Sequence, residues 1–343
     1  MVEKSLFGYT QDNQKVNLYR ITNKNGNYVE VIDYGCRIRK IVIADKKGNP
    51  LNMCLGYDSV LDYEKDVCFI GAAVGRYGNR IAKGEFDLNG VTYHLTQNEK
   101  GNHLHGGETN FGNQIWNVEN EDNKIVCKRR FMDGEEGYPG DMDVTITYSW
   151  NDENQLEISY EAVSTKDTII NLTNHAYFNL SGDSKKDILK HKLCILTDKL
   201  TVGDEKQIPT GEVMSVNGTP FDFRELHEIG ERIYEDDKQL HIGKGYDHNY
   251  MFDDFSMKKM AILQCEESGI QMICSSNQPG IQLYTGNNLD DTTKNVSGFD
   301  RYVALCLETQ NYPDAINHKN FPSPVLKANE VYQTKTIYEF SNM

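Results

Sequence analysis

The sequence has no apolar stretch near the roughly 20 residues that a helix needs to cross a bilayer. Residues 1–15 also lack the apolar segment of a secretory signal. A GxxxxGK loop followed by Ser or Thr is absent, no GxGxxG turn follows a predicted strand, and neither HExxH nor CxxC occurs. These absences argue against a membrane protein, a nucleotide-binding enzyme and a common zinc enzyme. They predict a cytoplasmic protein.

Basic residues are scarce relative to acidic ones: 36 Lys and Arg stand against 51 Asp and Glu, which gives a formal net charge of -15. A surface of this sign repels nucleic acid and anionic lipid, so we expect neither as a partner. The eight cysteines are scattered, without the spacing of a disulfide framework, and are predicted to be reduced thiols. A small neutral molecule is the expected partner.

Alternation of apolar and polar residues with a period of two is the clearest local pattern. Residues 85–95 alternate around the pair Asn89-Gly90, which supplies the positive φ angles of a type I′ hairpin turn. Residues 144–160 alternate in the same way around the polar stretch 151–154. Further predicted strands, rich in Ile, Val, Thr or Tyr, are 28–44, 168–172, 191–197, 261–265, 270–275, 281–285, 302–308 and 331–340.

Helical spacing is rare. It occurs in Phe223, Leu226, Ile229 and Ile233, with Asp222 as the expected N-cap, and a short helical turn is expected near residues 59–64. Many short strands with few helices predict an all-β protein built as a large antiparallel β-sandwich. Since no linker or internal repeat divides the chain, we expect one domain over residues 1–343, acting as a monomer or a homodimer.

Six segments are dense in residues that bind polyhydroxylated ligands. A neutral sugar is held by paired donors and acceptors such as Arg, Asn, Asp and Gln, with an aromatic face against its C–H groups. The segments are GRYGNRIAKG at 75–84, NHLHGG at 102–107, NLTNHAYFNL at 171–180, GYDHNY at 245–250, IQLYTGNN at 281–288 and LETQNYPDAIN at 307–317. They predict a sugar site, and the glycines among them predict tight turns beside a ligand.

Four residues in these segments could carry chemistry, and alternatives are open for them. His103 and His105 would share one face of an extended strand, as a metal pair does, with His175, Asp247 or Glu308 as a further ligand. Taken alone, His175 could equally be a core histidine bonded to backbone. Glu308 ends an apolar run, where a carboxylate needs a partner, so it is either functional or part of a structural ion pair.

Taken together and in this order, the six segments resemble the galactose mutarotase family, also called aldose 1-epimerases, over roughly residues 30–340. The resemblance implies a large antiparallel β-sandwich of that type with an open cleft. It also implies conversion of β-galactose to its α anomer by an isomerase that needs no cofactor and no metal. The substrate would be a free neutral hexose, galactose or glucose.

The resemblance also implies roles for individual residues. Glu308 in LETQ is similar to the general base of the family, and His175 in TNHAYF to its general acid. His105, the second histidine of NHLHGG, resembles the histidine that assists at the ring or anomeric oxygen. The positions that match sugar-binding residues are Asn79, Arg80, Asp247 and Gln282.

Two other functions remain open on sequence grounds. A hexose-6-phosphate 1-epimerase of related fold would need a cluster of cations for the phosphate, for which the six segments offer Arg76, Arg80 and Lys83. A sugar-binding sandwich without catalysis would need the polar and aromatic residues but not Glu308 with two histidines.

Overall fold

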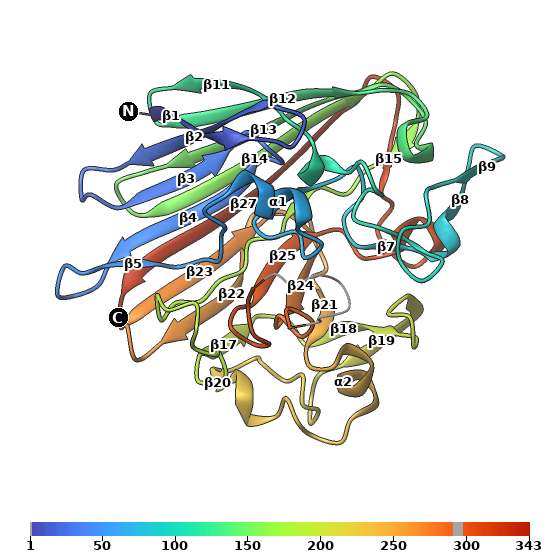
Figure 1. Cartoon of the computed structure of the whole chain (residues 1–343). Helices are drawn as coiled ribbons and strands as arrows, with labels where there is room; N and C mark the ends of the chain where they lie inside the picture. Colours follow the sequence, from blue (N-terminus) through green and yellow to red (C-terminus); the bar gives the residue numbers. More distant parts are fainter. Residues whose placement is uncertain (1, 291–297) are drawn as a thin grey trace.

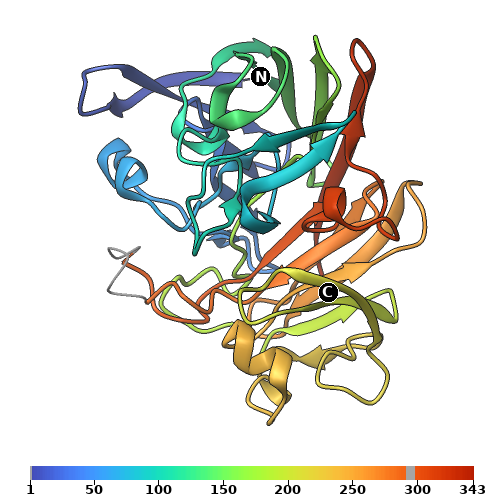
Figure 2. The ribbon, with the colours of Figure 1, turned by 90° about the vertical axis from the view of Figure 1, so that its right-hand side faces the viewer.

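The computed structural model describes residues 2–290 and 298–343, and antiparallel sheets make up most of its regular structure (Figures 1 and 2). The first sheet, in order β1-β2-β3-β4-β5, consists of β1 (Val2–Tyr9), β2 (Lys15–Thr22), β3 (Tyr28–Ile32), β4 (Arg37–Ala44) and β5 (Pro50–Asn52). The second, in order β11-β12-β13-β14-β27-β23-β22-β17-β20, consists of β11 (Asn117–Glu121), β12 (Lys124–Phe131), β13 (Met142–Trp150), β14 (Gln155–Ser164), β17 (Lys192–Ile195), β20 (His227–Glu228), β22 (Lys258–Cys265), β23 (Ile270–Ser276) and β27 (Val331–Asn342).

A third sheet, in order β19-β18-β21-β24-β25, lies at the lower right of Figure 1. Its strands are β18 (Lys199–Gly203), β19 (Pro209–Ser215), β21 (Asp247–Met251), β24 (Gly280–Tyr284) and β25 (Cys306–Gln310). Short two-stranded pairs complete the described sheets. They are β6 (Ala73–Val74) with β16 (Thr173–Asn174), β7 (Arg80–Ile81) with β10 (His103–Leu104), β8 (Glu85–Leu88) with β9 (Val91–His94), and β15 (Thr168–Ile169) with β26 (Val325–Leu326).

The first and second sheets pack face to face around one core. Tyr19 and Val31 of the first sheet belong to the same buried apolar cluster as Ile146 and Tyr160 of the second. A hydrogen bond also joins the two sheets, because the Tyr148 hydroxyl donates to the backbone carbonyl just before β4. Alternate strand residues point into this core, as the period of two requires. The predicted antiparallel β-sandwich is confirmed.

Both predicted hairpins are present. β8 and β9 pair around Asn89 and Gly90, whose φ angles of 53° and 78° are those of a type I′ turn. β13 and β14 pair over their full length around the polar turn between them. Local turn chemistry and side-chain alternation were therefore sufficient for these elements.

The described part of the chain has two short α-helices, α1 (Val60–Lys65) and α2 (Lys238–Gly243). α1 begins after Ser59, whose hydroxyl accepts from the Leu61 amide, and it confirms the helical turn expected near residues 59–64. α2 is too short to show a period. The 3₁₀ turns are η1 (Ala82–Gly84), η2 (Phe111–Asn113), η3 (Glu135–Gly137), η4 (Ile229–Glu231) and η6 (Ala315–Asn317).

The helix expected after Asp222 does not form. The Asp222 carboxylate accepts from the Arg224 guanidinium instead of capping a helix, and residues 227–228 form the edge strand β20. Phe223, Ile229 and Ile233 are nevertheless buried in the main core. Ile229 lies in the 3₁₀ turn η4 and the other two lie outside regular elements, so the prediction of one helix for this pattern was wrong.

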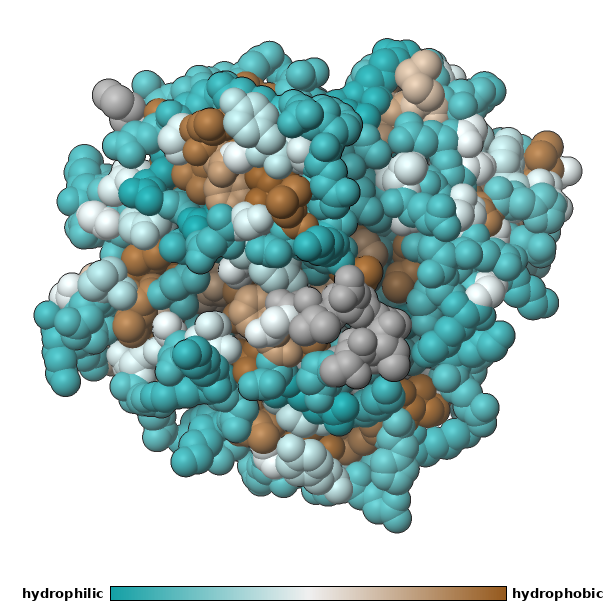
Figure 3. Space-filling model, in the orientation of Figure 1, coloured by the Kyte–Doolittle hydropathy of each residue, from teal (hydrophilic) through white to brown (hydrophobic). Residues whose placement is uncertain are grey.

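None of the helices in residues 2–290 and 298–343 has the length and apolar character that a membrane crossing requires. The face seen in Figure 3 is mostly hydrophilic, with its apolar residues in small separate patches.

The register of the third sheet aligns polar residues in a row across three strands. Asn249 of β21 lies opposite Gln282 of β24, and Gln282 lies opposite Glu308 of β25. Opposed residues of an antiparallel sheet point to the same face. Glu308 on this face lines the same cavity as Arg80 of β7 and Leu104 of β10, and β7 lies to the right of β25 in Figure 1.

Candidate active site

An open cleft between the third sheet and the β7 and β10 pair encloses about 660 Å3, part of it open to solvent. All three residues with implied catalytic roles, Glu308, His175 and His105, line this cleft. Of the four implied sugar-binding residues, Asn79, Arg80 and Asp247 also line it. Phe69, Tyr177 and Tyr284 add aromatic surface to its walls. Segments far apart in the sequence thus meet in one cavity.

Gln282 lines a second, narrower cavity of about 370 Å3, which shares Asn79, Arg80 and Asp247 with the cleft. Its side-chain amide donates to the Asp247 carboxylate at 2.6 Å. Gln282 therefore acts on the cleft through Asp247, whereas the other implied binding residues face the cleft themselves.

Glu308 and His175 form the centre of the site. Glu308 lies in β25 and is 2% exposed, and His175 follows directly after β16. Glu308 Oε1 lies 3.6 Å from His175 Nε2. The other carboxylate oxygen, Oε2, has no hydrogen-bond partner among the described residues. A buried carboxylate with a free oxygen beside an imidazole is suited to exchanging protons with a ligand.

Burial sets the protonation of this pair. It raises the pKa of Glu308 well above its ordinary value; the charge of Asp247 adds to the rise and that of Arg80 opposes it. Burial also lowers the pKa of His175 to about 3. Both groups are thereby pushed towards their neutral forms in the free protein.

Cys306 contacts the ring nitrogen of His175 that does not face Glu308. Its Sγ lies 3.3 Å from His175 Nδ1, and Cys306 and Glu308 lie two residues apart on one face of β25. A thiol is both a weak donor and a weak acceptor, so Cys306 can follow either tautomer of the imidazole. Burial raises the pKa of the Cys306 thiol well above its ordinary value, which keeps the thiol protonated. Nε2 is left to face the cleft.

His105 reaches the cleft because the chain turns sharply after β10. Its φ is 50°, and Gly106 and Gly107 also have positive φ. A Cβ on Gly106 would lie 1.8 Å from the Gly75 carbonyl oxygen, so this turn requires glycine, as expected for glycines beside a ligand. The backbone N–H of Asn79 donates to His105 Nδ1 at 3.1 Å. Because Nδ1 accepts, the neutral imidazole carries its proton on Nε2 and presents a donor to the cleft.

His103 does not share a face with His105, so their spacing of two does not place them as a metal pair. β10 ends at Leu104, and the left-handed His105 turns away from the strand direction. The His103 ring is buried between the Thr96 carbonyl, 2.7 Å from Nδ1, and the Tyr138 hydroxyl, 2.6 Å from Nε2. Both ring nitrogens are used, which makes His103 a core histidine.

The side chains of His105, His175 and Glu308 do bring three possible metal-ligand atoms within 4.8 Å of one another. A histidine nitrogen binds a metal only through its lone pair. The hydrogen bond from the Asn79 amide to Nδ1 puts the proton of His105 on Nε2, the nitrogen on the cleft side. This arrangement favours a hydrogen bond donated by His105 Nε2–H over metal binding at that nitrogen.

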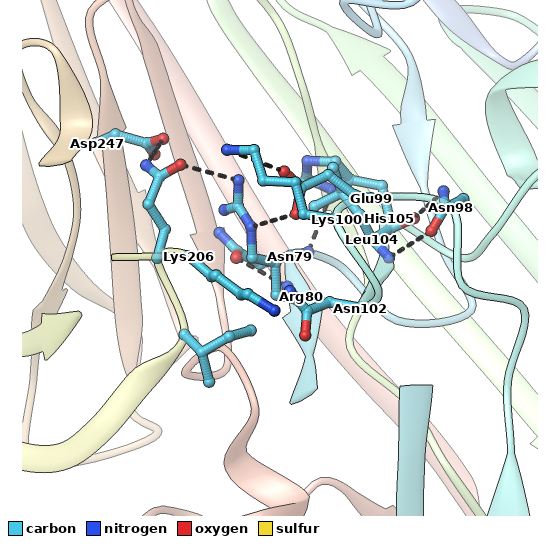
Figure 4. A network of polar contacts seen from close by, with 12 residues as sticks. Asn79, Arg80, Asn98, Glu99, Lys100, Asn102, Leu104, His105, Lys206 and Asp247 are labelled. Carbon is cyan, nitrogen blue, oxygen red and sulfur yellow. Dashed lines mark hydrogen bonds and ion pairs between the residues drawn. The ribbon is translucent and has the colours of Figure 1, made fainter. Parts of the chain in front are cut away.

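Arg80 and Asp247 belong to a polar network along one wall (Figure 4). Arg80 Nε donates to Glu99 at 3.2 Å, and Arg80 Nη2 donates to Gln207 Oε1 at 3.0 Å. Gln207 Nε2 in turn donates to Asp247 Oδ2 at 2.5 Å. Sequence reasoning missed Glu99, Gln207 and Cys306. Only Cys306 had a local signal, its position two residues before Glu308.

A sequence model of the family described as aldose 1-epimerase matches residues 17–339. The chain belongs to the aldose 1-epimerase family. The rat protein named galactose mutarotase is 39% identical over 316 residues, 91% of each chain. The Escherichia coli K12 protein named aldose 1-epimerase is 33% identical over 96% of each chain. The resemblance of the six segments is therefore confirmed, as is the class of enzyme, an isomerase.

Solved structures of family members share the fold. Galactose 1-epimerase from Lactobacillus acidophilus superimposes with a TM-score of 0.88 at 27% identity, covering 100% of this chain and 99% of that one. An aldose epimerase homologue from Caenorhabditis elegans gives a TM-score of 0.86 at 30% identity, covering 94% and 98%.

Proposed function

We propose that this protein interconverts the α and β anomers of free hexoses, with galactose as the substrate that the names of its relatives favour. One observation carries the mechanism: Glu308 Oε1 and His175 Nε2 lie 3.6 Å apart in the wall of one cleft. The anomeric and ring oxygens of a pyranose share carbon C1, so they lie closer together than 3.6 Å. A carboxylate and an imidazole at this separation can each reach one of them.

Ring opening then needs two proton transfers. The Glu308 carboxylate takes the proton of the C1 hydroxyl, the C1 to ring-oxygen bond breaks as a carbonyl forms at C1, and the His175 imidazolium protonates the ring oxygen. The open aldehyde turns about the C1–C2 bond. It closes from its other face while both residues run in reverse, which regenerates the starting protonation. No electron is gained or lost.

The remaining polar residues bind and polarise the sugar. Nε2–H of His105 donates to the ring or anomeric oxygen and stabilises the charge that develops there. Arg80 donates to a hydroxyl oxygen, and Asp247 accepts from a hydroxyl. Asn79 holds His105 in its donor tautomer. Phe69, Tyr177 and Tyr284 line the cleft and add aromatic surface for the C–H groups of the sugar.

The cleft offers little to a phosphate. Of the three cations considered for it, Arg80 alone lines the cleft within the described residues, and Glu99 and Asp247 accompany it. Arg76 lines another cavity and donates to the carbonyls of Pro139 and Gly140. A phosphate dianion would need more positive charge than this. A free hexose therefore fits better than a hexose phosphate.

Polarimetry of freshly dissolved α-galactose tests the proposal, with and without a chelator and with glucose and glucose 6-phosphate as alternatives. We expect acceleration with the free hexoses that survives chelation. Sugar binding without any acceleration would instead support a non-catalytic sugar-binding protein, and loss of activity with chelator would favour a metal at His105, His175 and Glu308.

The activity should have an unusual pH dependence. Between the lowered pKa of His175 and the raised pKa of Glu308 the pair holds one proton, mostly on Glu308. The reactive arrangement has that proton on His175, and its share does not change with pH because no proton is gained or lost. We expect kcat to stay level from roughly pH 4 up to the raised pKa of Glu308, and to fall above it as the pair loses its proton.

Anomer exchange followed by NMR, with the spontaneous rate subtracted at each pH, measures this profile. An acid limb with a midpoint near ~6.5, the ordinary pKa of histidine, would mean that His175 titrates as it does in water. The one-proton account would then be wrong.

We also propose a cytosolic setting and action by residues 1–343 as one unit. All eight cysteines are free thiols, as a reducing compartment allows. The main core cluster includes residues of all three large sheets, which argues against separate domains.

A further inference from the structure

Gln207 bridges two residues to which we assign sugar binding. Its Oε1 accepts from Arg80 Nη2 at 3.0 Å, and its Nε2 donates to Asp247 Oδ2 at 2.5 Å. The amide can take only this orientation, because the reverse would place its NH2 group against a guanidinium and its oxygen against a carboxylate. In Figure 4, Asp247 lies at the left end of the network and Arg80 lies near its middle.

Hydrogen bonds fix the conformation of the turn that contains Gln207. Gln207 lies in the loop between β18 and β19 with a φ of 61°. The Asp204 carboxylate accepts from the backbone amides of Lys206 and Ile208 at 2.8 and 3.0 Å. Gln239 of α2 makes a donor and an acceptor bond to the backbone of Gly203, both at 2.9 Å. A left-handed conformation at a non-glycine residue persists only where surroundings hold it.

Gln207 lies outside the cleft, next to residues that line it. It lines the second cavity, together with Gln282 and Asn249, and it is absent from the lining of the cleft. Asn249 Nδ2 and Oδ1 and Gln282 Oε1 are buried in this region without a partner among the described residues. Polar atoms therefore line the second cavity beside Asp247, and the Asp247 carboxylate could turn towards them.

Loss of the bridge would remove one restraint from each residue, with Arg80 still bonded to Glu99 and Asp247 still bonded to Gln282. Opposite charges attract, so the two groups could pair directly with each other, and either could instead turn into the second cavity. In both cases the donor and the acceptor for the sugar hydroxyls would no longer face the cleft in their original positions. A displacement of about 1 Å in a binding group can cost on the order of 100-fold in efficiency.

We infer that Gln207 is a positioning residue: it sets the separation of Arg80 and Asp247 and thereby the affinity of the cleft for the hexose. This inference rests on the proposed function. The residue touches neither reacting oxygen and acts through the two residues that it bridges. Its loss should therefore raise KM and leave kcat nearly unchanged.

Gln207→Met tests this inference because it keeps the length of the side chain and removes both hydrogen bonds. We expect KM for galactose to rise by about 10- to 100-fold, with kcat within about threefold of the wild type. Gln207→Glu should behave at least as badly, because its carboxylate would repel Asp247. Glu205→Gln, an exposed position in the same turn, is the matched control and should keep both constants.

A double-mutant cycle separates positioning from a general effect on the fold. Asp247→Asn should raise KM by itself. Adding Gln207→Met to Asp247→Asn should raise KM by a much smaller factor than Gln207→Met does in the wild type, because the carboxylate that Gln207 binds is already absent. Additive effects would overturn the inference, as would an unchanged KM in Gln207→Met or a fall in kcat alone. If Gln207→Met does not fold, Gln207→Asn, which is too short to span the gap, serves with the same expectation.

The failure of this inference is distinguishable from failure of the proposed function. A wild-type protein that does not accelerate anomer exchange would refute the proposed function. An active wild type whose KM does not respond at position 207 would refute only the role of Gln207.

Discussion

Glu308→Gln is expected to lower kcat for anomer exchange by about 1,000-fold while KM stays within about threefold of the wild type. Glutamine keeps the shape of the side chain and can still accept from a sugar hydroxyl, but it cannot take the proton. Glu308 is 2% exposed, and water cannot easily replace it as the base. Anomer exchange by NMR at saturating galactose measures the effect.

The control for this substitution is Glu157→Gln, the same chemical change on the solvent face of β14. It should leave both constants unchanged. Glu308→Gln should also unfold at a temperature close to that of the wild type, because burial already favours the neutral acid at this position and glutamine is neutral with the same shape. A wild-type rate in the folded variant would remove Glu308 from the mechanism.

Sequence reasoning reached the sandwich because its strands alternate in a simple way. The inward residues of β13 and β14 are apolar and their neighbours are polar, so a period of two suffices. The Asn89-Gly90 turn could be predicted for the same reason, since two neighbouring residues determine it.

Spacing failed where tertiary packing decides the backbone. The apolar residues after Asp222 have helical spacing, yet no α-helix forms there: Phe223, Ile229 and Ile233 reach the main core from loops and the 3₁₀ turn η4. His103 and His105 look like a pair on a strand, but the strand ends between them. In both cases the pattern was real and the regular element assumed for it was absent.

The sequence was sufficient to predict those site residues that lie within the family motifs. Segments around His105, His175, Asp247 and Glu308 carry family resemblance, and the fold brings these four residues into one cleft. Gln207 lies outside every such segment, in a turn whose sequence gives no sign of a ligand. Its place between Arg80 and Asp247 depends on how the hairpin of β18 and β19 packs, which no local pattern encodes.

His175→Asn is expected to lower kcat by about 100- to 1,000-fold, with a much smaller effect on KM. Without the imidazole, the ring oxygen must leave C1 without a proton from His175. His105 still donates a hydrogen bond there, so the loss should be somewhat smaller than for Glu308→Gln. Arg80→Ala should give the opposite division, a raised KM with kcat nearly retained, because Arg80 binds the sugar and transfers no proton.

Two features make this division informative. His175 is buried against the rings of Phe69 and Tyr177, so a stability loss must be separated from a catalytic one by thermal unfolding and by sugar binding in the folded variant. His94→Asn, at an exposed position of β9, controls for the substitution itself. If His175→Asn and Arg80→Ala changed kcat and KM alike, His175 would be a binding residue, and the proton for the ring oxygen would have to come from His105 or water.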